Sequence, residues 1–237
     1  MERVKTGING LDELVEGWVP KGSSFLVAGG TGTGKTIFAM QYLYRGALDY
    51  KEPGLLVTLE TNLKNIVWNM ESFRWDIRSL QERNMMRIYR LNLSNIDDTK
   101  EMRKKIDDEL KVISKLVEEI GAKRLAIDSI TALGIWVPEQ ARIRSILYQF
   151  TDKLKDLDCT TLLTTETSGN KTEYSSLSVE EFVVDGVVGL YFSSPNRSIF
   201  VKKMRGTNQS KYVHPFEITG NGILVNPKDR VMWDSIK

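Results

Sequence analysis

The stretch Ser24-Phe25-Leu26-Val27-Ala28-Gly29-Gly30-Thr31-Gly32-Thr33-Gly34-Lys35-Thr36 decides the fold of this chain. An apolar run at its start predicts a buried β-strand over 24–28, and the helical period that follows predicts a helix over 36–50. Between them the pattern Gly-x-x-x-x-Gly-Lys-Thr predicts a phosphate-binding loop, because that motif works only between a strand and a helix. Its glycines let the backbone curl so that N–H groups point at phosphate oxygens, helped by the helix dipole.

The side chains at the end of this loop have separate expected roles. Lys35 is expected to reach the β- and γ-phosphates, and the Thr36 hydroxyl to coordinate magnesium, which takes few protein ligands. The motif therefore predicts ATP and Mg²⁺ as cofactors. The residues of this stretch expected to bind the nucleotide are Gly30, Thr31, Gly32, Thr33, Gly34, Lys35, Thr36 and Ile37.

Three carboxylates follow apolar runs that read as strands. Asp128 is the expected second metal-site residue, with a helix cap as the alternative. Glu60 is expected to orient or deprotonate the attacking water, with an N-cap partner as the alternative. Glu166 is either a sensor near the phosphates or a structural residue. Ligands of open α/β sheets bind at the carboxyl ends of the strands, which is where all three are expected.

The rest of the chain alternates between strands and helices. Strands are expected over 54–59, 86–91, 124–128 and 160–165, and helices over 62–73, 100–120 and 139–157. This order predicts an α/β fold with a mostly parallel twisted sheet flanked by helices. Two further strand-like runs, 186–192 and 198–203, flank a turn-forming cluster over 193–197 and predict an antiparallel hairpin extension. We expect residues 1–237 to form one domain.

Composition limits the classes of function. The 237 residues are 41% hydrophobic and 27% charged, which is typical of a globular protein, and the net charge of +2 gives no global reason to expect nucleic acid or a membrane as partner. A single cysteine, Cys159, excludes an intramolecular disulfide. With no signal-peptide pattern or apolar span, we expect a cytoplasmic protein. Cys159 and the only histidine, His214, are expected to pack rather than to catalyse.

Further segments, taken together, are more specific than the loop alone. They are Thr6-Gly7-Ile8-Asn9-Gly10-Leu11-Asp12, Gly17-Trp18-Val19-Pro20-Lys21-Gly22, Val57-Thr58-Leu59-Glu60, Ser72-Phe73-Arg74-Trp75-Asp76, Ile127-Asp128-Ser129-Ile130-Thr131, Thr164-Thr165-Glu166, Val179-Glu180-Glu181-Phe182-Val183-Val184-Asp185-Gly186 and Lys203-Met204-Arg205-Gly206-Thr207. With these segments the chain resembles the KaiC family of the RecA-like P-loop ATPases over nearly its whole length.

The resemblance implies a slow ATPase that forms a homohexameric ring, with ATP between neighbouring subunits. It implies that Lys203 and Arg205 neutralise γ-phosphate charge in trans, and that Thr207 and Ser72 contact the nucleoside. Arginine suits this role because its planar, permanently charged fork matches phosphate oxygens. The alternative is that Lys202, Lys203 and Arg205 only protect an edge strand from aggregation.

Two departures from the family limit what is carried over. The family commonly shows two consecutive acidic residues where this chain has Glu60-Thr61, and its clock protein carries two such domains where this chain has one. Clock function is therefore not carried over, and autophosphorylation is not carried over either, because no Ser/Thr pair is matched to the phosphorylation sites of the clock protein. Two other functions stay open. One is a recombinase-type paralog acting in DNA repair, with Lys171 and Tyr174 in the loop 167–178. The other is a non-hydrolysing module that displays a surface to an unidentified protein partner.

Overall fold

The computed structural model describes residues 2–16, 19–59, 63–91, 99–133, 140–167 and 180–232. Its strands are β1 (Arg3–Val4), β2 (Val15–Glu16), β3 (Val19–Pro20), β4 (Ser24–Gly29), β5 (Gly54–Thr58), β6 (Met86–Arg90), β7 (Arg124–Asp128), β8 (Thr160–Glu166), β9 (Gly186–Ser193), β10 (Asn196–Met204), β11 (Asn208–Gln209), β12 (His214–Thr219) and β13 (Gly222–Val225). Its helices are α1 (Leu11–Leu14), α2 (Lys35–Asp49), α3 (Leu63–Glu71), α4 (Ile77–Glu82), α5 (Thr99–Ile120), the 3₁₀ turn η1 (Ile130–Ala132), α7 (Gln140–Lys155) and α8 (Glu180–Val183).

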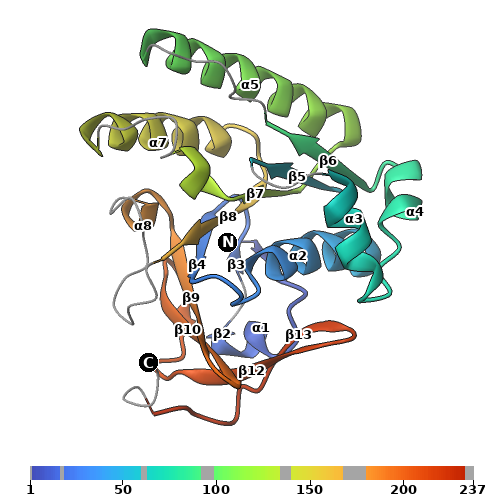
Figure 1. Cartoon of the computed structure of the whole chain (residues 1–237), viewed down its shortest axis with the longest axis vertical. Helices are drawn as coiled ribbons and strands as arrows, with labels where there is room; N and C mark the ends of the chain where they lie inside the picture. Colours follow the sequence, from blue (N-terminus) through green and yellow to red (C-terminus); the bar gives the residue numbers. More distant parts are fainter. Residues whose placement is uncertain are drawn as a thin grey trace.

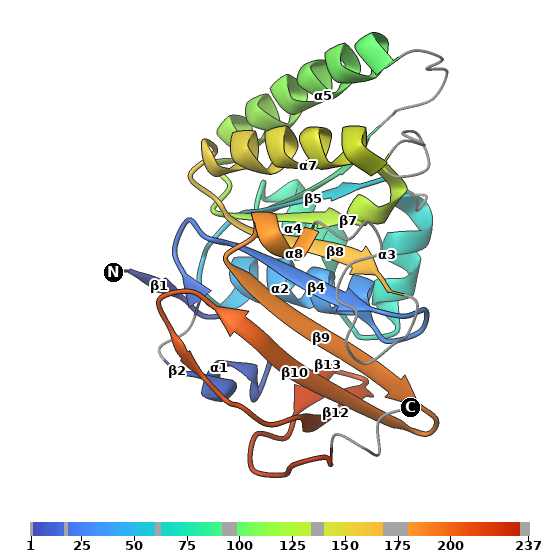
Figure 2. The same cartoon turned by 90° about the vertical axis from the view of Figure 1, so that its left-hand side faces the viewer.

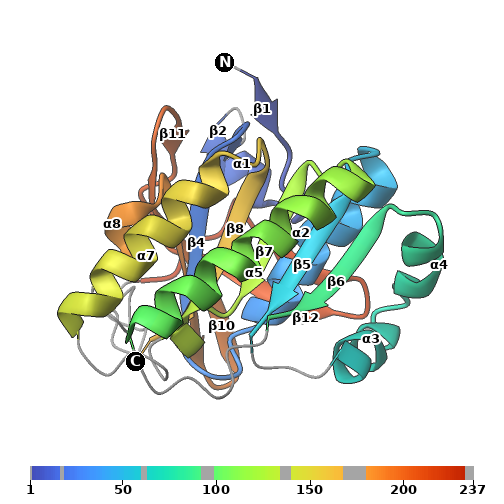
Figure 3. The ribbon, with the colours of Figure 1, turned by 90° about the horizontal axis from the view of Figure 1, so that it is seen from above.

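Within the described ranges, the main sheet has nine strands in the order β13-β12-β10-β9-β4-β8-β7-β5-β6. The part from β9 to β6 is parallel. Strands β10, β12 and β13 extend it in antiparallel fashion. Figure 1 and Figure 3 show helices α5 and α7 lying across one face and α2 on the other. The predicted α/β fold, with its mostly parallel sheet and its antiparallel C-terminal extension, is confirmed.

Both faces of the parallel strands are covered, which is why these strands read as continuous apolar runs. All residues of β4, β5 and β7 are buried. The predicted apolar stripes of the two long helices supply the core on one face, with Ile106, Leu110, Ile113, Val117, Ile120, Leu147, Phe150 and Leu154. Phe38, Tyr42 and Leu43 of α2 supply it on the other. Cys159 lies in the core as predicted, and burial raises the pKa of its thiol to about 12.

Strand register brings the expected site residues to one edge of the sheet. Gly29, the last residue of β4, pairs with Glu166 at the end of β8. Thr58, the last residue of β5, pairs with Asp128 at the end of β7. Since parallel strands end at the same edge, the loops that follow them share one rim. No helix in the described part of the chain has the length and apolar character that crossing a bilayer requires.

The C-terminal part differs from the prediction in two ways. The predicted turn over 193–197 is too long, because Ser193 and Asn196 already pair with each other and only Ser194 and Pro195 connect the strands. Strands β12 and β13 were not expected at all. They form a second hairpin in which Thr219 pairs with Gly222 across Gly220 and Asn221. This hairpin lies against β10 and widens the sheet.

A fully buried arginine stabilises the edge of the sheet opposite the candidate site. The Arg124 side chain, at the start of β7, has none of its surface exposed, and its Nε donates to Glu52 Oε2 at 2.6 Å. Its two terminal nitrogens donate to the carbonyls of Tyr42 and Lys5 at 2.9 and 2.8 Å. One side chain thereby ties the N-terminal segment and helix α2 to strand β7.

We predict that Arg124→Met lowers the free energy of unfolding by about 3–5 kcal/mol, because removing one partner of a buried ion pair leaves the other groups unpaired. Urea denaturation measures this change. Arg78→Met is the matched control, since the Arg78 side chain is 75% exposed and its pair with Glu71 spans 3.6 Å. Such surface pairs contribute about 0–1 kcal/mol. Equal urea concentrations at the midpoint of unfolding for the two variants would contradict the role given to Arg124.

Candidate functional site

The loop after β4 has the backbone shape that its glycines predict. Gly32 and Gly34 have φ angles of +77° and +100°, a region that favours glycine. A Cβ at Gly34 would also lie 3.0 Å from Ile218 Cδ1. The Thr33 hydroxyl donates to the Gly30 carbonyl at 2.8 Å and closes the loop on itself. These contacts fix the loop at the start of helix α2.

Lys35 is held inside this loop. Its Nζ donates to the carbonyls of Gly29 and Gly30 at 2.9 and 3.0 Å, and it lies 3.8 Å from Glu166 Oε1. The Lys35 side chain is only 10% exposed. The Glu166 backbone N–H donates to the Thr131 hydroxyl of η1 at 2.8 Å, which fixes the end of β8. The structure therefore places the lysine and the third predicted carboxylate together.

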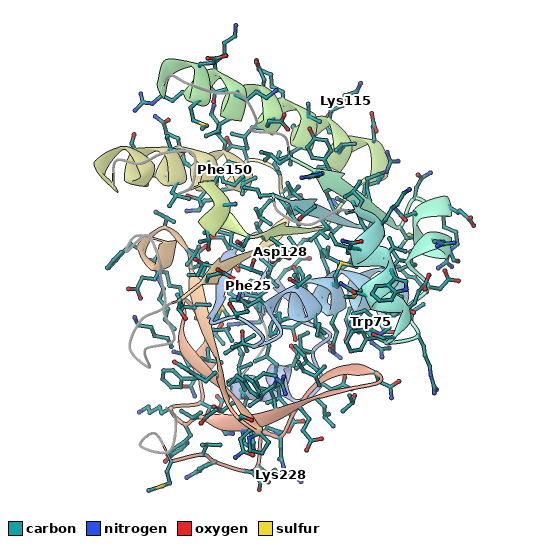
Figure 4. The ribbon with its side chains drawn as sticks, in the orientation of Figure 1. Phe25, Trp75, Lys115, Asp128, Phe150 and Lys228 are labelled. Carbon is teal, nitrogen blue, oxygen red and sulfur yellow. The ribbon has the colours of Figure 1, made fainter. Side chains whose placement is uncertain are left out.

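Thr36 and Asp128 meet at the centre of the site. The Thr36 hydroxyl donates to Asp128 Oδ2 at 2.8 Å, and the Thr164 hydroxyl of β8 donates to Oδ1 at 2.5 Å. Asp128 lies near the middle of the molecule in Figure 4. Within the described ranges, no group of three or more acidic, histidine or cysteine side chains is arranged to hold a metal ion. This hydroxyl–carboxylate pair fits Mg²⁺, which prefers oxygen ligands and usually keeps several waters.

These residues line a pocket of about 610 Å³. Its walls are Thr31, Gly32, Gly34, Lys35, Thr36, Ile37, Asp128, Ser129, Glu166, Arg197 and Ile218. A Cβ added at Gly30 or Gly32 would meet no atom within 4 Å, so open space lies over the loop where phosphates would sit. The loop, the pocket and the oxygen pair together fit a nucleotide with its metal ion.

Arg197 is a pocket residue that was not predicted from the sequence. It lies on β10, opposite Phe192 of β9 and Phe216 of β12. Its guanidinium carbon lies 4.3 Å from the centroid of the Phe192 ring, and Nη2 donates to the Gly32 carbonyl at 3.4 Å. Its Nε is buried and has no hydrogen-bond partner among the residues that the structure describes. A second cation therefore stands beside the phosphate loop.

Lys203, Arg205 and Thr207 do not reach this pocket. Strand β10 begins at Asn196, one residue before the pocket residue Arg197. Figure 2 shows it running from there alongside β9 to the opposite end of the sheet. Lys203 lies six residues after Arg197, which corresponds to about 20 Å along the strand at about 3.3 Å per residue. Lys203 Nζ donates to the carbonyls of Glu181 and Val184 at 2.6 and 2.8 Å. Burial, and after it the charge of Arg205, lowers the pKa of Lys203.

Other predicted site residues also lie elsewhere. Ser72 follows α3, where its hydroxyl donates to the Asn69 carbonyl at 2.7 Å, and it does not line the pocket. Trp75, three residues on, lies at the side of the molecule in Figure 4, away from Asp128. Thr207 accepts a hydrogen bond from Arg3 Nη1 at 2.7 Å. Glu60, Lys171 and Tyr174 lie outside the described residues.

Fold and site together define a P-loop protein with a RecA-like sheet. A family model described as the KaiC ATPase matches residues 4–230. The chain therefore belongs to the KaiC family of ATPases, as the sequence resemblance predicted. A crystal structure of a KaiC-like protein from Pyrococcus horikoshii superposes with a TM-score of 0.84 at 39% identity, covering 95% of this chain and 99% of that one.

Two kinds of protein are similar in sequence to this chain. A UPF0273 protein of Methanocaldococcus jannaschii is 40% identical, over 98% of this chain and 99% of its own length. The circadian clock oscillator protein KaiC of Parathermosynechococcus lividus is 37% identical, over 94% of this chain and 42% of its own length. The chain thus matches the UPF0273 protein from end to end and less than half of the clock protein.

Proposed function

We propose that this protein binds ATP with magnesium and hydrolyses it slowly within a ring of identical subunits. The observation that carries the proposal is the separation of two half-sites. The phosphate loop, Thr36 and Asp128 line one pocket, while Lys203 and Arg205 lie at the far end of β10. Among the described residues, the pocket half holds Lys35 and Arg197, and the other half holds Lys203 and Arg205, which the proposal places at the γ-phosphate of the neighbouring subunit. Both are present where one subunit meets the next.

Within one subunit, the proposed roles follow from position. The loop backbone and Lys35 bind the phosphates, and Thr36 and Asp128 hold the metal ion, which offsets charge on the phosphate oxygens when bound. Glu166, beside Lys35, is placed to respond to the charge of the terminal phosphate. Glu60 is the proposed carboxylate for the attacking water, on the basis of the sequence alone.

Exposed apolar side chains support self-association. Phe182 is 70% exposed on α8, between the two carbonyls that bind Lys203. Trp68 is 71% exposed on α3, which lies on the opposite side of the molecule from α8 in Figure 1. A head-to-tail contact joins two different surfaces of identical subunits and closes into a ring when the rotation allows it. Two separate apolar positions fit that kind of contact.

The proposal is tested by measuring mass and phosphate release on one sample, with ATP and Mg²⁺ and with ATP and EDTA. We expect a ring with magnesium-dependent turnover, and slower turnover in Glu60→Gln. A monomer under every condition would contradict the trans site. A ring with no measurable turnover would instead favour a non-hydrolysing, ATP-gated module.

Arg197 is proposed as a further nucleotide contact from the same subunit. We predict that Arg197→Ala weakens ATP binding by about 10- to 10²-fold, because a hydrogen bond to a charged group contributes about 1.5–3 kcal/mol. Titration of the purified protein with a fluorescent ATP analogue measures this. Arg230→Ala is the control, since Arg230 stacks on Tyr212 and does not line the pocket. Unchanged affinity in Arg197→Ala would remove Arg197 from the site.

A further inference from the structure

Both cations of the trans half-site are held by one short segment, which comprises α8 and the two residues after it. Lys203 binds carbonyls of this segment, as described above. Arg205 Nη1 donates to Asp185 Oδ1 at 3.3 Å, and the Arg205 backbone N–H donates to the Asp185 carbonyl at 3.0 Å. Asp185 therefore contacts Arg205 through both its side chain and its main chain.

The sheet itself contributes to this arrangement. The pairing of β9 with β10 shifts register between Val201 and Lys203, so Lys202 is the extra residue of a β-bulge. A bulge redirects the side chains that follow it. Lys202 pairs with Glu181, and Lys203 points to the carbonyls on either side of Phe182. The two neighbouring lysines are thereby both turned toward α8.

Asp185 is in turn fixed to the strand that carries the phosphate loop. Its Oδ2 accepts hydrogen bonds from the Ser24 N–H and hydroxyl at 3.0 and 3.2 Å, and its own N–H donates to the Ser24 carbonyl at 2.8 Å. Ser24 is the first residue of β4 and is buried. One carboxylate oxygen of Asp185 therefore binds Ser24 at the start of β4, and the other binds Arg205.

Because the two carboxylate oxygens of Asp185 bind different residues, Arg205 is held at one point and still exposed to solvent. The Arg205 side chain is 63% exposed, whereas that of Asp185 is 24% exposed. An arginine has five N–H donors in a rigid fork, so one contact to Asp185 leaves donors for phosphate oxygens. A long side chain held at one point also loses less conformational entropy when it binds.

We propose that Asp185 is the positioning residue of the trans site, which fixes Arg205 on the start of β4 so that it meets the nucleotide of the neighbouring subunit. The inference rests on the proposed function, because it needs Arg205 to act across an interface. It goes beyond that function because Asp185, which is not proposed to contact the nucleotide, would affect the rate of hydrolysis. Replacing Asp185 in one subunit should therefore slow hydrolysis in the pocket of the neighbouring subunit.

The first test is Asp185→Asn, which keeps an oxygen for Ser24 but removes the charge that holds Arg205. We expect kcat to fall by about 10–100-fold, since a misplacement of about 1 Å costs up to about 10²-fold, with little change in KM for ATP. Asp158→Asn is the control, because the Asp158 side chain is 83% exposed and lies 4.0 Å from Lys123. A wild-type kcat in Asp185→Asn would overturn the proposal.

The second test separates positioning from folding. Asp185→Asn subunits keep an intact pocket, and Lys35→Ala subunits keep an intact Arg205, so co-expressed mixed rings should regain activity. We expect about a quarter of the wild-type rate, because in a randomly mixed head-to-tail ring half of the pockets are intact and half of these face an intact arginine. A structural defect in the Asp185→Asn subunit would not be rescued by its neighbour.

Mixed rings of Arg205→Ala and Lys35→Ala serve as the reference. Recovery in this reference without recovery for Asp185→Asn would overturn the positioning role and leave the proposed function standing. No recovery in either mixture would overturn both. If Asp185→Asn does not assemble, Ser24→Ala replaces it, since that change removes one hydrogen bond to Oδ2. It should lower kcat a few-fold at constant KM, and an unchanged kcat would overturn the proposal.

Discussion

An Arg205→Ala variant is expected to hydrolyse ATP about 10³-fold more slowly than the wild-type protein, the lower end of the range for an arginine supplied in trans. Its affinity for ATP should change by about 10-fold or less, because an interaction made mainly in the transition state affects kcat more than binding. Arg205 directly follows Met204, the last residue of β10, at the end of that strand remote from Arg197, so it does not line the pocket of its own subunit.

Single-turnover and steady-state phosphate release, with ATP affinity measured separately, test this expectation. Arg78→Ala is a suitable control, since Arg78 is also an exposed arginine paired with a carboxylate but lies on α4. Ring assembly must be checked by mass in both variants. Wild-type turnover in an assembled Arg205→Ala ring would show that Arg205 has no part in hydrolysis.

A Lys35→Ala variant should lose most of its affinity for ATP. The Lys35 ammonium lies in the pocket wall against the carbonyls of Gly29 and Gly30. Lys35 is the proposed donor to the β- and γ-phosphates, and hydrogen bonds to a charged group contribute about 1.5–3 kcal/mol each, so losing two such bonds to the phosphates should raise Kd by at least about 10²-fold. Turnover at ordinary ATP concentrations should fall with it.

Equilibrium binding of ATP with Mg²⁺ measures this loss directly. Lys21→Ala is the control, because the Lys21 side chain is 46% exposed and pairs with Glu2 on the surface. Tight ATP binding by Lys35→Ala would contradict the assignment of the phosphate loop.

The local parts of the site were predictable from the sequence. The phosphate loop directly follows a buried strand and Asp128 is the last residue of another, and the order of strands and helices predicts that such strands end at one edge. The register of the sheet brings Gly29 beside Glu166, which is why Glu166 lies near Lys35. Short-range patterns were sufficient to place the phosphate loop, Asp128 and Glu166 at this edge, but not to choose between the two expected roles of Glu166.

Contacts that depend on the C-terminal strands were not predictable in the same way. Arg197 reaches the loop only because β10 packs beside β9, which lies next to β4. The hairpin of β12 and β13, which brings Ile218 to the pocket, did have a signal in Gly220 and Asn221 between two apolar runs. Asp185 contacts both Arg205 and Ser24. Because Ser24 lies 161 residues before Asp185 in the sequence, no local pattern indicates that these residues meet.

The most direct test of the account mixes two inactive variants. Lys35→Ala lacks a working pocket, and Arg205→Ala lacks the arginine offered to the neighbour. Phosphate release by co-expressed mixed rings is compared with that of each variant alone. If the site is completed in trans, the mixture should reach about a quarter of the wild-type rate, for the same reason as above. A mixture no more active than its components would contradict a site shared between subunits.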